Sequence, residues 1–459
     1  MSEQKRQKQM VLGAMMFFPS GGHISSWRHP EVNAQGLLDF NYYKQILQTA
    51  ERGKFDMFFY ADELYVWDRF ETGISHANSI RPEPFTLLSA LAVVTEHIGL
   101  AATVSTTYNE PYHIARKLAT LDHLSNGRAA WNIVTSQADE EARNFSRDKH
   151  LEHSKRYERA VEFVDVTQGL WDSWEDDALL LDKESGYFAD KDKLHNIQHK
   201  GVHFQVQGPL NVTRPPQGYP VLAQAGASES GKEVAAEKAE VVFAPIHSFD
   251  AEGLLAGQQL YEDIKGRMAK YGRSRDELKI IPGIMPIIGQ TEEEAKEKLA
   301  AIESLLPEQL GLDLLSHYLG QDISSYPLDE PLPFRPDLSQ FNQSKSALER
   351  ILEMMDKEQL TLRQLYQRST NRRGLAGTPE QIADFLEEWF LKGAADGFNV
   401  QFSHLPGGLD DFVNLVVPEL QRRGVFRIEY TGGTLRDNLG LKRPDNRFVS
   451  VRADHLAHS

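Results

Sequence analysis

Short apolar runs alternate with longer amphipathic stretches along most of the chain, and this alternation limits the fold more than any other feature. Runs such as FDMFFYA and LKIIPGIMPII are apolar along nearly their whole length, which is typical of parallel strands covered on both faces. Alternating strands and helices predict a parallel sheet with crossover helices. The predicted strands are Met10–Phe18, Phe55–Ala61, Ile98–Ser105, Ala129–Thr135, Pro220–Ala225, Val241–Pro245, Lys279–Ile288 and Phe398–Ser403.

The stretches between these runs show the three- and four-residue apolar spacing of helices. In the first of them, Tyr43, Ile46, Leu47 and Ala50 share one face. Eight strand–helix units favour a closed barrel over a doubly wound sheet, and no G-x-G-x-x-G fingerprint follows any predicted strand. The predicted fold class is α/β, a (β/α)8 TIM barrel with insertions. The predicted helices are Asp39–Gly53, Phe85–His97, Tyr112–Leu124, His153–Trp171, Gly231–Lys238, Ala251–Tyr271, Glu292–Leu305 and Leu409–Arg423.

Two stretches interrupt the alternation. Ser173–Gly218 ends in an H-x-F-x-V alternation and is predicted to form an inserted hairpin region. Pro307–Gly377 contains the proline-rich SSYPLDEPLPFRP and a helical piece near Ser346–Gln367. It is too long for an ordinary connection, so we expect it to form a lid over the carboxyl ends of the strands. Residues 1–459 are thus predicted to form a single expanded barrel.

Charge and cysteine content exclude several classes of function. The 459 residues include 50 Lys and Arg against 66 Asp and Glu, a net charge of −16. An acidic surface repels phosphate backbones and anionic lipid, so neither nucleic-acid nor membrane partners are expected. The absence of cysteine rules out disulfides, thiolate metal sites and cysteine nucleophiles. The start MSEQKRQKQMV lacks the apolar region of a signal peptide, and no segment has about 18 uninterrupted apolar residues, so we expect a cytoplasmic protein.

Barrel enzymes carry their active sites at the carboxyl ends of the strands, so the residues that follow each predicted strand are the candidates. Small hydroxyls, amides and glycine dominate there, with a carboxylate at Asp62, and such a lining suits an uncharged heterocycle and a phosphate. The segment QAGASESG ends a strand and opens a helix near Ser228, whose N-terminus offers free N–H groups to a phosphate. The candidates are Asp62, Glu63, Tyr65, Thr103, Ser105, Thr106, Tyr108, Asn132, Thr135, Ser136, Gln137 and His404.

Each of these signals also has an ordinary structural explanation. Ser228 could simply cap its helix, and Asp62 could cap a turn. The pair His150 and His153 has metal-like spacing, but no third ligand is close in the sequence, so no metal is predicted. His153 and Tyr157 are four residues apart and share a helix face. Spacing alone therefore indicates a barrel that binds a phosphate-bearing ligand, and goes no further.

Longer motifs carry a resemblance to a known family. WRHP at Trp27–Pro30, ERGKFD before FFYAD, TLDHLSNGRAAWNIVTS, EHSKRY, QAGASESG and the tail VVPELQRRGVFRIEYTGGTLRDNLGL resemble the bacterial luciferase-like flavin monooxygenases. The similarity covers nearly the whole chain. Within that superfamily it points to the branch of nitrilotriacetate, dibenzothiophene sulfone and long-chain alkane monooxygenases.

The resemblance implies a two-component system. A separate NAD(P)H-dependent flavin reductase would supply reduced FMN, and a flavin C4a-hydroperoxide formed with O2 would oxygenate a small organic substrate. This chain would then need no NAD site, which agrees with the missing dinucleotide fingerprint. The family's FMN-binding positions fall on Asp62, Thr103, Ser136, His153, Tyr157, Ala227 and Ser228. Its histidines match His317 and, with an offset, His23, as catalytic candidates. A homodimer or homotetramer is also implied.

The substrate and two rival functions stay open. The alkane enzyme has a cysteine in the first loop that this chain lacks. Arg368, Arg372 and Arg373 could bind a polycarboxylate or form a solvated loop. The loop MMFFPSGGH with Tyr65, Trp67 and Phe70 could line a partly aromatic substrate pocket, or Phe17, Phe18 and Trp67 could simply pack the lid. A sulfur heterocycle, an aminopolycarboxylate and an S-substituted cysteine all fit. The rivals are a deazaflavin-dependent reductase of the same superfamily and a non-catalytic flavin-binding protein.

Overall fold

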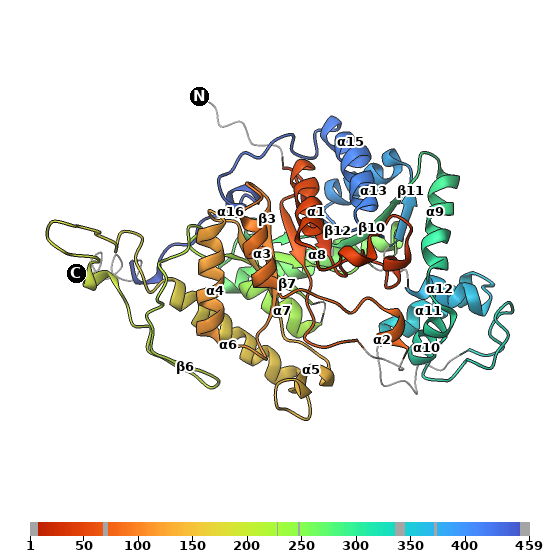
Figure 1. Ribbon diagram of the computed structural model, residues 1–459, viewed down its shortest axis with the longest axis horizontal. Coiled ribbons are helices and arrows are strands. Elements are labelled where there is room, and N and C mark those ends of the chain that lie inside the picture. The colour runs from red at the N-terminus through yellow and green to blue at the C-terminus, as the bar shows by residue number, and fades with distance from the viewer. Residues whose placement is uncertain are drawn as a thin grey trace.

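Eight parallel strands close into a barrel (Figure 1). The computed structural model describes residues 8–67, 72–226, 228–246, 248–335, 345–370 and 374–449. The barrel strands are β1 (Val11–Met16), β2 (Met57–Tyr60), β3 (Gly99–Ser105), β4 (Ala129–Val134), β7 (Val221–Ala225), β8 (Val241–Phe243), the two-part strand β9 (Lys279–Ile280) and β10 (Gly283–Ile288), and β12 (Gly397–Gln401). The predicted TIM barrel and its eight strands are confirmed.

The ring closes at the two-part strand. β9 pairs with β8 and β10 pairs with β12, while Ile281 and Pro282 interrupt the strand between them. Proline has no N–H to donate, which breaks the ladder at this point. The carbonyl of Pro282 still accepts from the amide of Asn399 at 2.9 Å. A further strand, β11 (Gly374–Gly377), pairs with β10 beside the ring.

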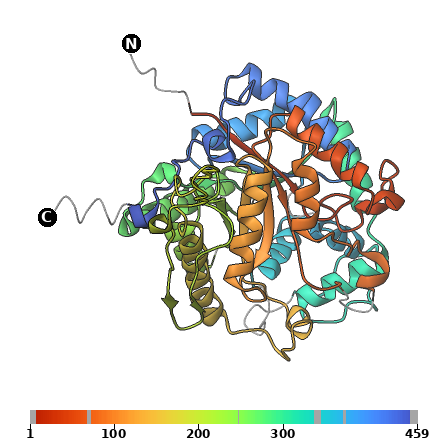
Figure 2. The ribbon, with the colours of Figure 1, turned by 60° about the vertical axis from the view of Figure 1, so that its left-hand side comes forward.

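Helices surround the strands on the outside, from both the first half of the chain and its end (Figure 2). Two predicted helices differ in detail. α3 ends at Ala92, earlier than predicted, and the predicted helix Leu409–Arg423 is divided by a π-helical segment, Phe412–Val416, just before Pro418. Such a division is expected where proline leaves a carbonyl without its donor. The helices are α1 (Phe40–Arg52), α2 (Gly73–His76), α3 (Pro84–Ala92), α4 (Pro111–Leu124), α5 (Asp139–Arg143), α6 (His153–Trp171), α7 (Glu229–Lys238), α8 (Ala251–Arg267), α9 (Glu292–Ser304), α10 (Glu308–Leu319), α11 (Lys345–Lys357), α12 (Leu362–Thr370), α13 (Pro379–Leu391), α14 (Gly407–Asp411), α15 (Val417–Arg422) and α16 (Leu435–Asn438).

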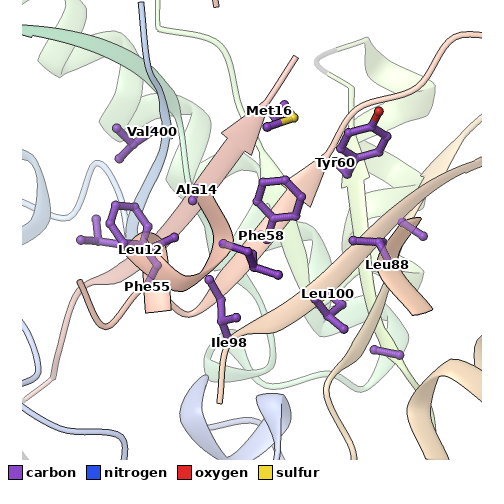
Figure 3. Close-up of a cluster of buried hydrophobic side chains, with 14 of the residues drawn as sticks. Leu12, Ala14, Met16, Phe55, Phe58, Tyr60, Leu88, Ile98, Leu100 and Val400 are labelled. Carbon is purple, nitrogen blue, oxygen red and sulfur yellow. The ribbon is translucent and has the colours of Figure 1, made fainter. Parts of the chain in front are cut away.

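Alternate residues along each strand serve two different cores. In β1, Leu12, Ala14 and Met16 pack with the surrounding helices, as Figure 3 shows together with Phe58 and Leu100. The intervening residues point into the barrel, where they form a second buried cluster with side chains of the other strands. That interior cluster includes Val11, Met15, Met57, Phe59, Ala101, Ala130, Val221, Ala223, Val241 and Ile281. The barrel is therefore filled with side chains, which leaves its rim for binding.

The two insertions lie on different sides of the barrel (Figure 1). The region Ser173–Gly218 joins α6 to β7 and contains the antiparallel pair β5 (His199–Lys200) and β6 (Gln205–Val206). The region Pro307–Gly377 holds α10, α11 and α12, so the predicted helical piece Ser346–Gln367 is two helices. These three helices bury a leucine-rich cluster of their own, against which Ile24 and Trp67 of the loops after β1 and β2 also pack.

Among the described residues, no helix is both long and apolar enough to cross a bilayer.

Candidate functional site

Buried polar side chains join three neighbouring strands near their carboxyl ends. Thr103 donates through Oγ1 to the carbonyl of Tyr60 at 2.7 Å and accepts from Nδ2 of Asn132 at 2.9 Å. The amide oxygen of Asn132 is buried and has no hydrogen-bond partner among the described residues. The same holds for the hydroxyl of Tyr60. Because a buried polar atom without a partner costs free energy, the Asn132 oxygen inside the barrel marks a place where a ligand can supply a hydrogen bond, whereas the Tyr60 hydroxyl lies on the helix-facing side of the sheet.

The loop after β4 is tied to the start of α6. Ser136 has a φ of +57°, in the left-handed region, and its hydroxyl bonds to Ser105 at 2.9 Å and to Glu141 at 3.0 Å. Arg156 on α6 donates to the carbonyl of Ser136. The sequence pattern singled out Ser136; the part played by Arg156 in holding this loop was not predicted.

The first turns of α6 face the end of β7. The rings of His153 and Tyr157 lie 4.8 Å apart. A Cβ built on Gly226 would lie 3.4 Å from the hydroxyl oxygen of Tyr157 and 2.5 Å from Nε2 of Gln224. A larger residue at 226 would therefore press into Gln224 and crowd Tyr157. The side-chain oxygen of Gln224 is another buried acceptor with no partner in the described part of the chain.

Helix α7 starts beside this point. Ser228 is its N-cap, and the Ser228 hydroxyl accepts from the amide of Gly231 at 3.1 Å. The capping role considered for Ser228 is therefore real. It does not conflict with a ligand, because the cap uses one of several free N–H groups at the helix start. Ala227, predicted with Ser228, lies outside the described residues.

Asp62 stands at the end of β2 in an unusual electrostatic setting. Burial raises the pKa of its carboxyl to about 7, while the nearby guanidinium of Arg81 opposes that rise. Arg81 also forms an ion pair with Glu63 at 3.2 Å. Asp62 is therefore held close to half-protonation at neutral pH, unlike an exposed turn carboxylate.

His23 is almost completely buried, at 1 % exposure. Burial lowers the pKa of its imidazole to about 4, so the ring is neutral at pH 7. Nδ1 accepts from the amide of Ser25 at 3.2 Å, which puts the proton on Nε2. Nε2 has no hydrogen-bond partner within the described residues. The ring can thus donate one hydrogen bond to a ligand.

His317 lies on α10, and the position of its neighbour Asp313 shows where its helix face points. Asp313 accepts from the hydroxyl of Thr72 at 2.6 Å. Residues 313 and 317 are four apart and share a face, so His317 projects toward the segment that follows β2. That segment leads into the walls of a large cavity.

The cavity has a volume of about 820 Å³ and is bounded mainly by the loops that follow β1 and β2. Sequence reasoning missed most of this region, because a cavity between irregular loops leaves no periodic pattern. Its lining includes Trp27, Ala34, Leu37, Glu63, Leu64, Tyr65, Val66, Ile74, Ala77, Asn78, Ser79, Ile80, Arg81 and Asn144.

Other predicted residues have different surroundings. His404, after β12, bonds to Glu31 at 3.0 Å and stacks on His29 at 3.7 Å between ring centroids. These three offer nitrogen and oxygen atoms within 4.8 Å of one another, a spacing that a metal ion could use. His150 contacts Tyr108 instead.

Arg368, proposed for a polycarboxylate, does not line the cavity. Arg368 pairs with Glu358 and its side chain is 42 % exposed. Arg372, Arg373 and Phe70 lie outside the described residues. Phe17 and Phe18 contact each other at 4.7 Å between ring centroids.

The rim of this TIM barrel combines a helix N-terminus, a large adjoining cavity and buried polar atoms that have no partner among the described residues. Such a rim is typical of a barrel enzyme that binds a polar cofactor. Comparison with known proteins gives the family. The model of the luciferase-like monooxygenase family matches residues 19–396, and the chain belongs to this family.

Individual relatives agree over nearly the full length. The chain is 49 % identical over 449 residues to N-acetyl-S-(2-succino)cysteine monooxygenase of Bacillus subtilis, covering 97 % of this chain and 99 % of the relative. It is 51 % identical over 451 residues to nitrilotriacetate monooxygenase component A of Aminobacter aminovorans, covering 96 % and 98 %. The crystal structure of DmoA from Hyphomicrobium sulfonivorans superposes with a TM-score of 0.83 at 36 % identity, covering 94 % and 92 %.

The chain is therefore a flavin-dependent monooxygenase of the luciferase-like family. This confirms the family, the branch and the class of function predicted from the sequence, over a deazaflavin-dependent reductase or a non-catalytic protein. The roles of individual site residues stay predictions.

Proposed function

We propose that this chain takes reduced FMN from a separate NAD(P)H-dependent flavin reductase and adds one oxygen atom from O2 to a small carboxylate-bearing substrate that contains sulfur or nitrogen. One observation carries the flavin part of this proposal. The hydroxyl oxygen of Tyr157 lies close to Gly226, and beside them the side-chain oxygen of Gln224 is a buried acceptor with no partner in the described chain. A ligand with a phosphate arm can meet such groups.

The phosphate end of FMN is assigned to the two helix starts. His153 and Tyr157 project from α6, and Ser228 begins α7 beside Gly226. Free amides at the start of α7 would hold the phosphate oxygens with help from the Tyr157 hydroxyl. Ala227 belongs to the same proposal through its position in the sequence.

The ring end is assigned to Asp62, Thr103 and Ser136, which lie at the ends of β2, within β3 and after β4. Bound reduced flavin supplies the electrons that activate O2. His23 would donate from Nε2 toward the reacting atoms, and His317 would approach from the insertion. The insertion would act as a lid that keeps water from the site, which is the purpose such covers serve in reactions that water diverts.

The proposed substrate class is supported by the substrates in the names of two relatives. The relatives at 49 % and 51 % identity act on N-acetyl-S-(2-succino)cysteine and nitrilotriacetate, which are both small polycarboxylates. The cavity beside Asp62 has apolar walls and one buried cation, which suits an organic anion better than a long alkane.

The proposal is tested with purified protein, FMN, NADH and a flavin reductase, and mass spectrometry of the products. Product with one added oxygen, together with substrate-dependent O2 uptake, is the expected result. A second arm places the reductase behind a membrane that passes FMN but not protein. Continued turnover there supports delivery by diffusion, and turnover only in the mixed chamber would require direct contact. Reduction of a substrate without O2 uptake would contradict the proposal.

We also propose that the chain works in the cytoplasm as a single expanded barrel that pairs into a homodimer or a dimer of dimers, since most soluble oligomers are symmetric homo-oligomers. Light scattering at micromolar concentration should give two or four times the 52.0 kDa chain mass. A monomer would contradict it.

A further inference from the structure

Arg81 presents buried hydrogen-bond donors that the described protein does not use. Its side chain is 4 % exposed and lines the 820 Å³ cavity. Nη2 faces Glu63 in the ion pair at 3.2 Å, while Nε and Nη1 have no hydrogen-bond partner among the described residues. Most buried side-chain polar atoms have a hydrogen-bond partner, because an unused donor in a buried position costs free energy. Arg81 therefore carries buried donors at the cavity wall that no described residue satisfies.

The surroundings fix the orientation of this guanidinium. Its carbon lies 5.3 Å from the ring centroid of Phe17 and 5.2 Å from that of Phe18. Both rings follow β1 directly, so the end of the first barrel strand supports the cation. Glu63 lies opposite Nη2 in the ion pair. A planar fork held in this way can grip an anion through two parallel N–H groups.

Arg81 also connects the cavity to the proposed flavin site. Its charge opposes the raised pKa of Asp62, so the two groups are electrostatic neighbours. Asn78, another lining residue, donates to the hydroxyl of Ser20 at 3.1 Å, in the loop that carries His23. The cavity thus shares walls with both predicted catalytic and flavin-binding positions, which is where a substrate must lie.

We infer that Arg81 is the anchor for a substrate carboxylate, and that the cavity beside it holds the organic body of that substrate. Trp27, Leu37, Val66 and Ile80 provide apolar walls for that body. The inference rests on the proposed function for the identity of the reaction and adds the residue that determines specificity. It replaces Arg368, which pairs with Glu358 on the insertion, as the cation for a polycarboxylate.

The test compares three variants, Arg81→Gln, Arg81→Lys and Glu63→Gln, with a distant control. Arg422→Gln removes an arginine that is 71 % exposed and paired with Glu419 on α15. Dissociation constants are measured for FMN, nitrilotriacetate, N-acetyl-S-(2-succino)cysteine and the uncharged dibenzothiophene sulfone. Calorimetry gives each constant without turnover.

Arg81→Gln should weaken binding of the carboxylate compound that the wild type accepts by about 10- to 100-fold, the loss expected for a charge-assisted pair. Arg81→Lys should recover part of that loss, because lysine keeps the charge without the fork. Glu63→Gln should bind the carboxylate more tightly, since a competing negative charge is gone. FMN affinity should change by less than about threefold in all variants, and Arg422→Gln should match the wild type.

Two kinds of failure are distinguishable. If the wild type binds FMN and oxygenates only the sulfone, or if Arg81→Gln binds the carboxylate like the wild type, the inference is wrong while the proposed flavin chemistry stands. If the wild type binds no FMN and forms no oxygenated product, the proposed function itself fails. Should Arg81→Gln not fold, Arg81→Lys and Glu63→Gln decide the question through their opposite expected shifts.

Discussion

The two ends of the barrel differ in how their buried polar groups are paired. At the amino ends the buried charges form ion pairs, although Nε of Arg427 and Nε of Arg436 have no hydrogen-bond partner among the described residues. Asp396, before β12, bonds to Lys265 at 2.8 Å, and Arg128, before β4, donates to five oxygen atoms. At the carboxyl ends, Tyr60, Asn132 and Gln224 each leave a buried atom without a partner in the described chain. Both ends belong to the same strands, so the fold itself does not explain why buried polar groups are paired at one end and lack partners at the other.

This contrast separates stability from function. Paired buried charges stabilise the protein only while both partners are present, because removing one leaves the other desolvated and alone. Unpartnered groups destabilise the protein until a ligand satisfies them, which is typical of binding sites. The insertions follow the same division. The insertion Ser173–Gly218 is held at the amino ends of the strands by the ion pair of Arg214 with Asp172. The helices of the insertion Pro307–Gly377 pack on the loops after β1 and β2.

The largest expected effect is at the phosphate end of the site. Tyr157→Phe combined with Ser228→Ala should weaken FMN binding by about 3–6 kcal/mol, since each lost charge-assisted hydrogen bond costs about 1.5–3 kcal/mol. Flavin titration measures this effect. The unfolding free energy should fall by only about 1 kcal/mol, through loss of the α7 cap.

Thr291→Ala is the matched control for that cap. Thr291 caps α9 and accepts from the amide of Glu294 at 3.2 Å. The control should lose a similar amount of stability and no FMN affinity. Equal FMN affinity in the double variant and the wild type would remove Tyr157 and Ser228 from the site.

At the amino ends, Asp172→Asn should produce the opposite pattern. Asp172 is fully buried and accepts from Arg214 and Arg447, each at 3.1 Å. Breaking a buried pair costs about 3–5 kcal/mol of unfolding free energy. FMN affinity should not change. Denaturant unfolding and flavin titration of one preparation measure both quantities.

Asp445→Asn serves as the control for this variant, because it removes the same charge from an exposed pair with Lys442 nearby in the fold's last segment. An exposed pair is worth about 0–1 kcal/mol. A large loss in the control, or none in Asp172→Asn, would break the proposed division between the two ends.

Sequence patterns predicted the barrel well because its strands are continuous apolar runs. All eight lie within the predicted ranges to a few residues, and α6 has the predicted bounds His153–Trp171. The short helices α2 and α5 were missed, since one turn leaves no periodic signal. The helix predicted over Ser346–Gln367 divides between Lys357 and Leu362.

The candidate site was predicted less evenly. Residues placed by strand ends, such as Asp62 and Thr103, lie at the predicted edge, because parallel strands bring their carboxyl ends together. Arg81 was missed, whereas Gln224 begins the segment QAGASESG that the sequence pattern singled out. Arg81 is a lone cation in an irregular segment, and only the folded chain shows that two of its nitrogens are buried without a partner among the described residues.

An aspartate-to-asparagine substitution at the carboxyl end, Asp62→Asn, should stabilise the protein, in contrast to Asp172→Asn. Burial raises the pKa of Asp62 to about 7, against about 3.9 in an unfolded chain. Between about pH 4 and pH 7 the folded protein keeps a proton that the unfolded chain has lost, so this group makes stability fall as pH rises. Asp62→Asn removes that dependence.

The expected gain of Asp62→Asn relative to the wild type is about 1–3 kcal/mol at pH 8 and close to zero at pH 4. Asp62 is partly exposed, and the substitution also removes its attraction to Arg81. The gain in unfolding free energy is therefore smaller than the value that the pKa difference alone would give. Unfolding curves at both pH values measure it. A loss of stability at pH 8, like that of Asp172→Asn, would show that the two ends do not differ in this respect.

The smallest expected effect is that of His317 on the fraction of oxidised flavin that yields product and not hydrogen peroxide. His317 shares a face of α10 with Asp313, which bonds to Thr72 in the segment after β2. His317→Ala should keep FMN affinity and stability within about 1 kcal/mol of the wild type. Product formed per flavin oxidised should fall about fivefold, with hydrogen peroxide making up the difference. A fivefold change between competing rates corresponds to about 1 kcal/mol.

His113→Ala controls for the loss of an imidazole, because His113 is exposed on α4. Its yield per flavin should equal that of the wild type. Peroxide release is measured with a coupled peroxidase assay, and product by mass spectrometry of the same samples. If His317→Ala formed product at the wild-type yield, His317 would be a structural residue of the insertion. In that case, the apolar packing of Ile24 and Trp67 against the helices of the insertion would exclude solvent from the carboxyl end.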